Sequence, residues 1–76
     1  MGIREVFARN LRRRRQERGL SQEALASEAG LDRTYISALE RGVYSPTIEV
    51  VDKLAAALGT EASELLRDEA GGKRRQ

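Results

Sequence analysis

The sequence has no cysteine, no histidine and no tryptophan. Their absence excludes disulfide bonds, thiol nucleophiles, imidazole bases and the usual zinc sites. Most enzyme chemistry is excluded with them, so we expect neither an enzyme nor a bound metal or cofactor. The chain also lacks a secretion signal and any apolar run of the roughly 18 residues that a membrane span needs. We therefore expect a cytoplasmic protein without a membrane partner.

With 76 residues the chain is one small domain at most. A domain of this size buries only about 60% of the surface that it exposes when unfolded, so a partner subunit or a ligand would add to its stability. The formal net charge of +2 conceals an asymmetry, because residues 1–20 carry a net charge of +5, residues 21–70 carry −6 and residues 71–76 carry +3. A basic segment of this kind is compatible both with nucleic-acid binding and with an ordinary solvated surface.

Apolar residues recur at intervals of three and four, which is typical of helices, and no alternating strand pattern occurs. We expect an all-α, compact domain of five short helices over residues 1–70 and a disordered basic tail over residues 71–76. The first helix is expected from Ile3 to Arg18. Capping residues and glycines mark the others: one helix from Ser21 to Gly30, one from Asp32 to Gly42, and a short last helix that Thr60 opens. The fourth helix is expected to have Ser45 as its cap and Pro46 as its first residue, with Thr47 as a residue that could share the capping, and to end at Gly59.

Residues 22–41 have the spacing of two helices joined by a tight turn. Ala26 supplies the small side chain that two helices need where they cross closely at about 90 to 120°. Gly30 supplies the positive φ that a short turn requires. Ile36 and Leu39 would then anchor the second helix of the pair in the core. This combination predicts a helix-turn-helix unit.

The segments at residues 20–26, 30–37 and 40–42 read LSQEALA, GLDRTYIS and ERG. They resemble the Cro/lambda-repressor-like helix-turn-helix family, also called XRE-type regulators, and the resemblance covers residues 5–67. It implies a lambda-repressor-like fold in which helices two and three form the helix-turn-helix, and a protein that binds DNA and regulates transcription. Within this family the chain is most similar to the controller proteins of restriction-modification systems.

The third helix offers a polar face for reading DNA. If Ile36, Leu39 and Glu40 face inward, the opposite face consists of Arg33, Thr34, Ser37, Ala38 and Arg41. A helix fits the major groove, where an arginine can donate two hydrogen bonds to a guanine. We expect Arg33 to be the main base reader, with Thr34 and Ser37 contacting bases or phosphates and Ala38 contacting a thymine methyl group. An ordinary solvated helix surface is the alternative.

Further contacts to the DNA backbone are expected around this helix. The resemblance implies that Gln22 touches a phosphate, and free amides and the helix dipole at the start of a helix already favour an anion. Arg41, Tyr44 and Ser45 surround the following loop, a second place for phosphate contacts. Tyr35 lies at the margin of the buried stripe, where both a phosphate contact and a packing role fit its ring and hydroxyl.

Two charged residues have a structural rather than a catalytic explanation. Glu40 stands four residues after Ile36 on the buried stripe, so its carboxylate needs a cationic partner. The resemblance implies that this partner is Arg15. Arg14 departs from the family, which has an apolar residue there: either its guanidinium reaches solvent over the core, or the first helix packs differently.

One recognition helix reads too few base pairs for genomic specificity, so we expect a homodimer on palindromic half-sites of double-stranded DNA, about 34 to 36 Å apart. The candidates for the dimer interface are Val50, Ala57, Leu65 and Leu66, all of which would equally fit a core. RNA polymerase is a further candidate partner, and no small-molecule ligand is expected. The alternative function is a protein-interaction module, such as an antitoxin or coactivator, because fold alone does not settle function.

Overall fold

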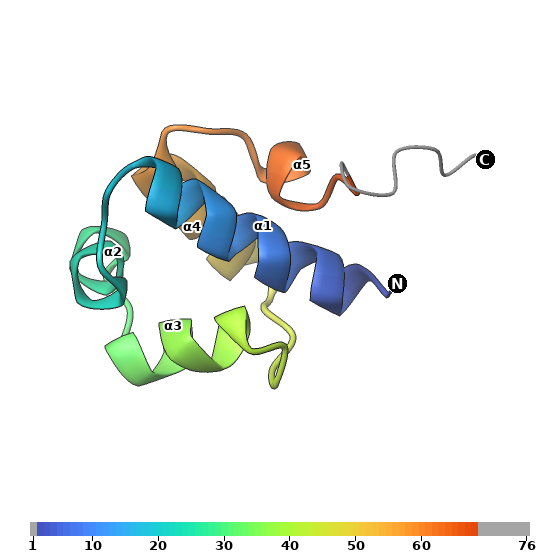
Figure 1. The fold of residues 1–76 in the computed structure, drawn as a ribbon, viewed down its shortest axis with the longest axis horizontal. Helices are drawn as coiled ribbons and strands as arrows, with labels where there is room; N and C mark the ends of the chain where they lie inside the picture. Colours follow the sequence, from blue (N-terminus) through green and yellow to red (C-terminus); the bar gives the residue numbers. More distant parts are fainter. Residues whose placement is uncertain (1, 69–76) are drawn as a thin grey trace.

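The computed structural model describes residues 2–68, which form five helices and no strand. They are α1 (Ile3–Glu17), α2 (Gln22–Ala29), α3 (Arg33–Glu40), α4 (Ile48–Leu58) and α5 (Ala62–Leu65) (Figure 1). The expected all-α fold of five helices is confirmed. The end of the domain at residue 70 and the basic tail at residues 71–76 lie outside the described residues. Within residues 2–68 no helix is long and apolar enough to cross a membrane.

The turn between α2 and α3 is built from the expected local signals. The hydroxyl oxygen of Ser21 accepts a hydrogen bond from the amide of Ala24 at 3.0 Å, and the carboxylate of Asp32 accepts one from the amide of Thr34 at 3.2 Å. Gly30 ends α2 in the left-handed region with φ of 71°, which a glycine adopts without steric cost. Both caps and this glycine therefore confirm the helix-turn-helix boundaries.

Of the two capping residues expected at the start of α4, the structure uses Thr47, so Ser45 does not cap the helix and Pro46 does not open it. Thr47 is the capping residue, and its hydroxyl oxygen accepts a hydrogen bond from the amide of Val50 at 3.1 Å. The short α5 also starts later than expected, after Glu61. The reason is that Thr60 completes the end of α4, where its amide donates to the carbonyl of Ala55 at 2.9 Å.

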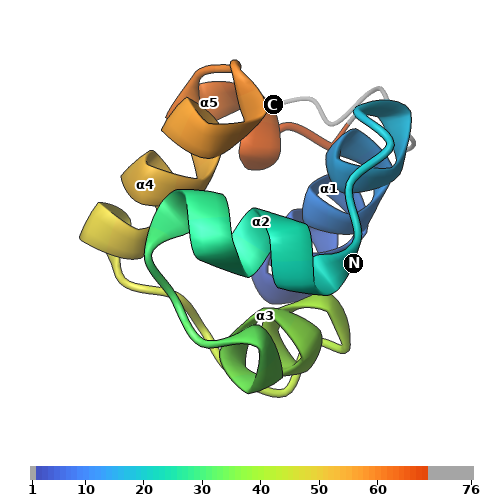
Figure 2. The same ribbon diagram turned by 90° about the vertical axis from the view of Figure 1, so that its left-hand side faces the viewer.

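The core lies where α1, α2, α3 and α4 converge, with α5 packed against α1 and α4 (Figure 2). Its apolar side chains come from all five helices. They are Phe7, Leu11, Leu25, Ala26, Ile36, Leu39, Val51, Leu54, Ala55, Leu58 and Leu65. Because α3 contributes only one face to this core, its other face is left on the surface.

A buried amide holds the end of α5 against α1. The side chain of Asn10 is 1% exposed, and its nitrogen donates to the carbonyls of Leu65 at 3.0 Å and Arg67 at 2.7 Å. Nearby, the guanidinium of Arg14 meets the carboxylate of Glu64 at 3.2 Å, with both side chains about a quarter exposed. Arg14 thus lies over the core with its guanidinium paired and only partly exposed, which agrees in part with the first of the two interpretations.

Candidate nucleic-acid interface

α3 lies along one edge of the molecule, with no other helix on its outer side (Figures 1 and 2). Ile36 and Leu39 are fully buried beneath it, so the helix has the expected orientation. Arg33 and Thr34 are exposed, and Ser37 is half-buried beside them. Within residues 2–68 the side chain of Arg33 makes no hydrogen bond or ion pair, which leaves its guanidinium available to a ligand.

Ala38 is not part of this outer face, contrary to the expectation that it contacts a thymine methyl group. Its side chain is only 4% exposed. Successive residues of a helix are about 100° apart, which places Ala38 about 100° from Leu39, at the edge of the buried sector. The buried part of the α3 surface extends to Ala38 because α1 also packs against α3. The surface that remains for DNA is therefore more polar than expected.

The expected ion pair between Arg15 and Glu40 is present and fixes α3 to α1. Nε of Arg15 donates to one carboxylate oxygen of Glu40 at 2.6 Å, and Nη2 donates to the other at 3.0 Å. The side chains are 11% and 4% exposed, respectively. The hydrogen bond with Glu40 raises the pKa of Arg15 above its ordinary value, against the opposing effect of desolvation. The pair is therefore a charged structural link.

Gln22 belongs to the same network, which the sequence reasoning did not anticipate. Its side-chain nitrogen donates to Glu40 at 3.1 Å, so the start of α2 is joined to the end of α3. The sequence carried no local signal for this contact, because 18 residues separate the two side chains. The half-buried Gln22 thus sits where the free amides of the first turn of α2 favour an anion.

Tyr35, in the first turn of α3, and Tyr44, in the loop after this helix, lie close together. The rings of Tyr35 and Tyr44 are 6.3 Å apart and tilted by 38°. Tyr35 is half-buried against the core, whereas Tyr44 and Ser45 are exposed in the loop that follows α3. Arg41, which ends the helix, is exposed as well. The structure therefore brings the expected backbone-contact residues of the loop beside the outer face of α3.

The expected dimer residues do not form one surface. Leu65 is fully buried in the core and is wrong as an interface residue, because α5 packs it inward against α4. Val50 and Ala57 are half-buried against the core, and only Leu66 is exposed. Ile48 is 84% exposed and lies directly after the cap of α4.

An apolar patch instead joins the start of α1, the start of α4 and the end of α5. We define this apolar patch as Ile3, Pro46, Ile48 and Leu66, which line a hollow of about 190 Å³. Phe7 and Val51 form its buried floor. Arg4 and Ser45 also line this hollow. The patch contains no residue of α3, and it meets the expected DNA-contact residues only at Ser45, in the loop after α3.

Comparison with known proteins identifies related chains. The family model for helix-turn-helix domains matches residues 11–65. A Neisseria hypothetical transcription factor from Neisseria meningitidis is 48% identical over 64 residues, which are 84% of this chain and 60% of that protein. This chain thus spans 60% of the length of that relative.

A control protein and a restriction-modification controller protein are also similar to the chain. The control protein C.SmaI of Serratia marcescens is 44% identical over 66 residues, covering 87% of this chain and 79% of that protein. The crystal structure of the controller protein C.AhdI from Aeromonas hydrophila superimposes with a TM-score of 0.79 and 44% identity, covering 82% of this chain and 94% of that one.

Proposed function

Because the chain belongs to the helix-turn-helix family of DNA-binding transcriptional regulators, we propose that it binds palindromic operators as a homodimer in the cytoplasm. The observation that carries this proposal is the outer face of α3, where Arg33 is exposed and has no partner within residues 2–68. The buried pair of Arg15 and Glu40 holds that face rigidly. A rigid support is what precise hydrogen bonding to base edges needs.

We assign direct base reading to α3. The guanidinium of Arg33, at the start of the helix, donates two hydrogen bonds to a guanine in the major groove. Thr34 and Ser37 contact neighbouring bases or phosphates. The contacts to the DNA backbone come from residues around the helix: Gln22, Tyr35, Arg41, Tyr44 and Ser45.

The homodimer supplies the second half-site. A two-fold dimer presents two copies of α3 about one turn of DNA apart, roughly 34 to 36 Å. The apolar patch is the surface that we assign to this contact, since it leaves the outer face of α3 uncovered. Regulation then depends on the concentration of dimer.

The similarity to C.SmaI and C.AhdI supports a narrower proposal, that the chain is itself a restriction-modification controller protein. Such a protein would bind an operator beside the genes of an endonuclease and a methyltransferase and would act on transcription by RNA polymerase. Transcription from that promoter, measured in vitro as the protein is titrated, tests this directly. A response confined to unrelated promoters would contradict the controller role.

A binding selection from randomised duplexes tests the general proposal. Wild-type protein is expected to enrich a palindrome, and Arg33→Ala is expected to bind it about 1 to 3 kcal/mol more weakly and to lose preference at one base pair of each half-site. Lys53→Ala is the control, because Lys53 is an exposed cation on α4, away from α3. Failure to enrich a sequence, with capture of one stoichiometric protein partner instead, would favour a protein-interaction module.

A further inference from the structure

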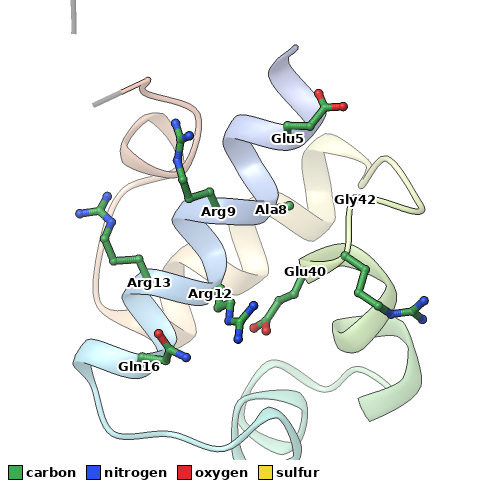
Figure 3. A pocket seen from close by; sticks show the side chains of 9 residues that line it. Glu5, Ala8, Arg9, Arg12, Arg13, Gln16, Glu40 and Gly42 are labelled. Atoms are coloured by element: carbon green, nitrogen blue, oxygen red, sulfur yellow. The ribbon is translucent and has the colours of Figure 1, made fainter. Parts of the chain in front are cut away.

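A cleft with a volume of about 410 Å³ separates α1 from the C-terminal end of α3 (Figure 3). Its α1 side includes Ala8, Arg12 and Gln16, and its α3 side includes Glu40 and Arg41. Ala8 is buried, and its small side chain leaves room between the two helices. The volume far exceeds the share of about 30 Å³ that one water molecule occupies in the liquid, so the cleft has room for a larger polar group.

Two arginines of the cleft are available to a ligand. Arg12 and Arg41 are exposed, and within residues 2–68 their side chains make no hydrogen bond or ion pair. Figure 3 shows the guanidinium of Arg12 directed into the cleft, toward Glu40. By contrast, Arg9 is bound to Asp68 at 3.1 Å. Arg12 and Arg41 are therefore two lining cations that have no partner within residues 2–68.

The carboxylate of Glu40 at the inner wall does not repel an anion strongly. Both of its oxygens already accept hydrogen bonds from Arg15, and one also accepts from Gln22. Glu5, exposed at the rim, is the remaining acidic side chain of the cleft. Two available cations thus face one available carboxylate, which gives the cleft an excess of positive charge.

The cleft also adjoins the place where DNA is proposed to pass. Gln22 at the start of α2 is bonded to Glu40 at 3.1 Å, so the inner wall of the cleft is in direct contact with the start of α2. The free amides and the dipole at that end of a helix favour an anion. A phosphate held at the start of α2 would therefore lie beside the cleft.

We propose that the cleft binds a phosphate of the DNA backbone, with Arg12 and Arg41 as the cations and the amide of Gln16 as a further donor. The inference rests on the proposed function, and it extends the DNA contact surface from the helix-turn-helix onto α1. The contact contributes affinity without sequence information, because phosphates are the same at every base pair. A free phosphate ion or a nucleotide could bind to the same arginines, and the experiment below distinguishes such a ligand from the DNA backbone.

The test measures the dissociation constant at several chloride concentrations, on the selected operator and on a scrambled duplex. Arg12→Gln is expected to weaken binding to both duplexes by the same factor and to reduce the salt slope by about 0.9, the contribution of one phosphate contact. Glu5→Gln is expected to strengthen binding to both. Lys53→Gln removes the same charge from α4 and is expected to leave the slope unchanged.

An unchanged slope and affinity for Arg12→Gln would overturn the inference, while loss of operator preference in Arg33→Ala would still support the proposed function. Stabilisation of the DNA-free protein by inorganic phosphate, at constant ionic strength and absent in Arg12→Gln, would assign the cleft to a free anion and overturn the inference if Arg12→Gln also left the affinity for DNA unchanged. Binding of no duplex by the wild-type protein would reject both proposals. The urea unfolding midpoint of Arg12→Gln checks folding, and no change is expected because the side chain is exposed and has no partner within residues 2–68.

Discussion

The carboxylate of Glu40 joins three helices beside the proposed interface. It accepts hydrogen bonds from Arg15 on α1 and from Gln22 on α2, and it belongs to α3 itself. A buried charge is costly unless it is paired and hydrogen-bonded. The same contacts that satisfy Glu40 therefore fix the recognition helix relative to two other helices.

Replacing Glu40 with alanine is expected to destabilise the protein by about 3 to 5 kcal/mol, because Arg15 is left as a buried charge without its carboxylate. Urea unfolding monitored by circular dichroism measures the loss. The control is the double variant Arg15→Met with Glu40→Met, which removes both charges and is expected to unfold at a higher urea concentration than Glu40→Ala. A loss below about 1 kcal/mol for Glu40→Ala would contradict a structural role for the pair.

The residue-scale predictions from sequence were accurate where they depended on strong periodicity. Ile36 and Leu39 are both fully buried, which leaves Arg33 on the surface as expected. The prediction for Ala38 was wrong because a small side chain at the edge of the buried stripe can be either buried or exposed. The packing of α1 against α3 buries it, and this packing is not visible in the sequence. Gln22 could be placed at the start of α2 but not against Glu40, because that contact depends on the fold.

At the scale of helices, boundaries set by local chemistry were predictable. Ser21 and Asp32 cap their helices because a side-chain oxygen next to the first turn satisfies a free amide. The start of α4 was ambiguous, because Ser45 and Thr47 flank Pro46 and both can cap. The position of α5 on α1 could not be predicted, since it depends on Asn10 and carbonyl groups more than 50 residues away.

Asn10→Ala is expected to weaken the attachment of α5 to α1. The carbonyls of Leu65 and Arg67 lose their donor, which costs about 1 to 3 kcal/mol if no other group replaces it. Hydrogen exchange is expected to speed up over residues 62–68 more than in α2. Gln16→Ala, an exposed change on the same helix, should leave exchange unaltered. Equal exchange rates in α5 of Asn10→Ala and wild type would refute this role for Asn10.

At the scale of the whole molecule, the polar face of α3 and the apolar patch lie on different helices and meet at Ser45, in the loop after α3. The polar face of α3 and the cleft beside it carry Arg33, Arg12 and Arg41, whereas the apolar patch joins α1, α4 and α5. A dimer formed through the patch leaves both recognition helices free to enter DNA. It also adds buried apolar area to a domain that is too small to bury much alone.

Ile48→Lys tests whether the apolar patch holds the dimer together. Ile48 is 84% exposed, so its replacement should change the stability of one protomer by no more than about 0.5 kcal/mol, while a lysine in an apolar contact would disfavour the dimer. Sedimentation equilibrium is expected to show monomers at concentrations where wild type dimerises, with affinity for the full palindrome falling more than affinity for a half-site. Ala56→Lys adds the same charge to an exposed position of α4 outside the patch and should remain dimeric. Equal dimer dissociation constants for Ile48→Lys and wild type would place the interface elsewhere.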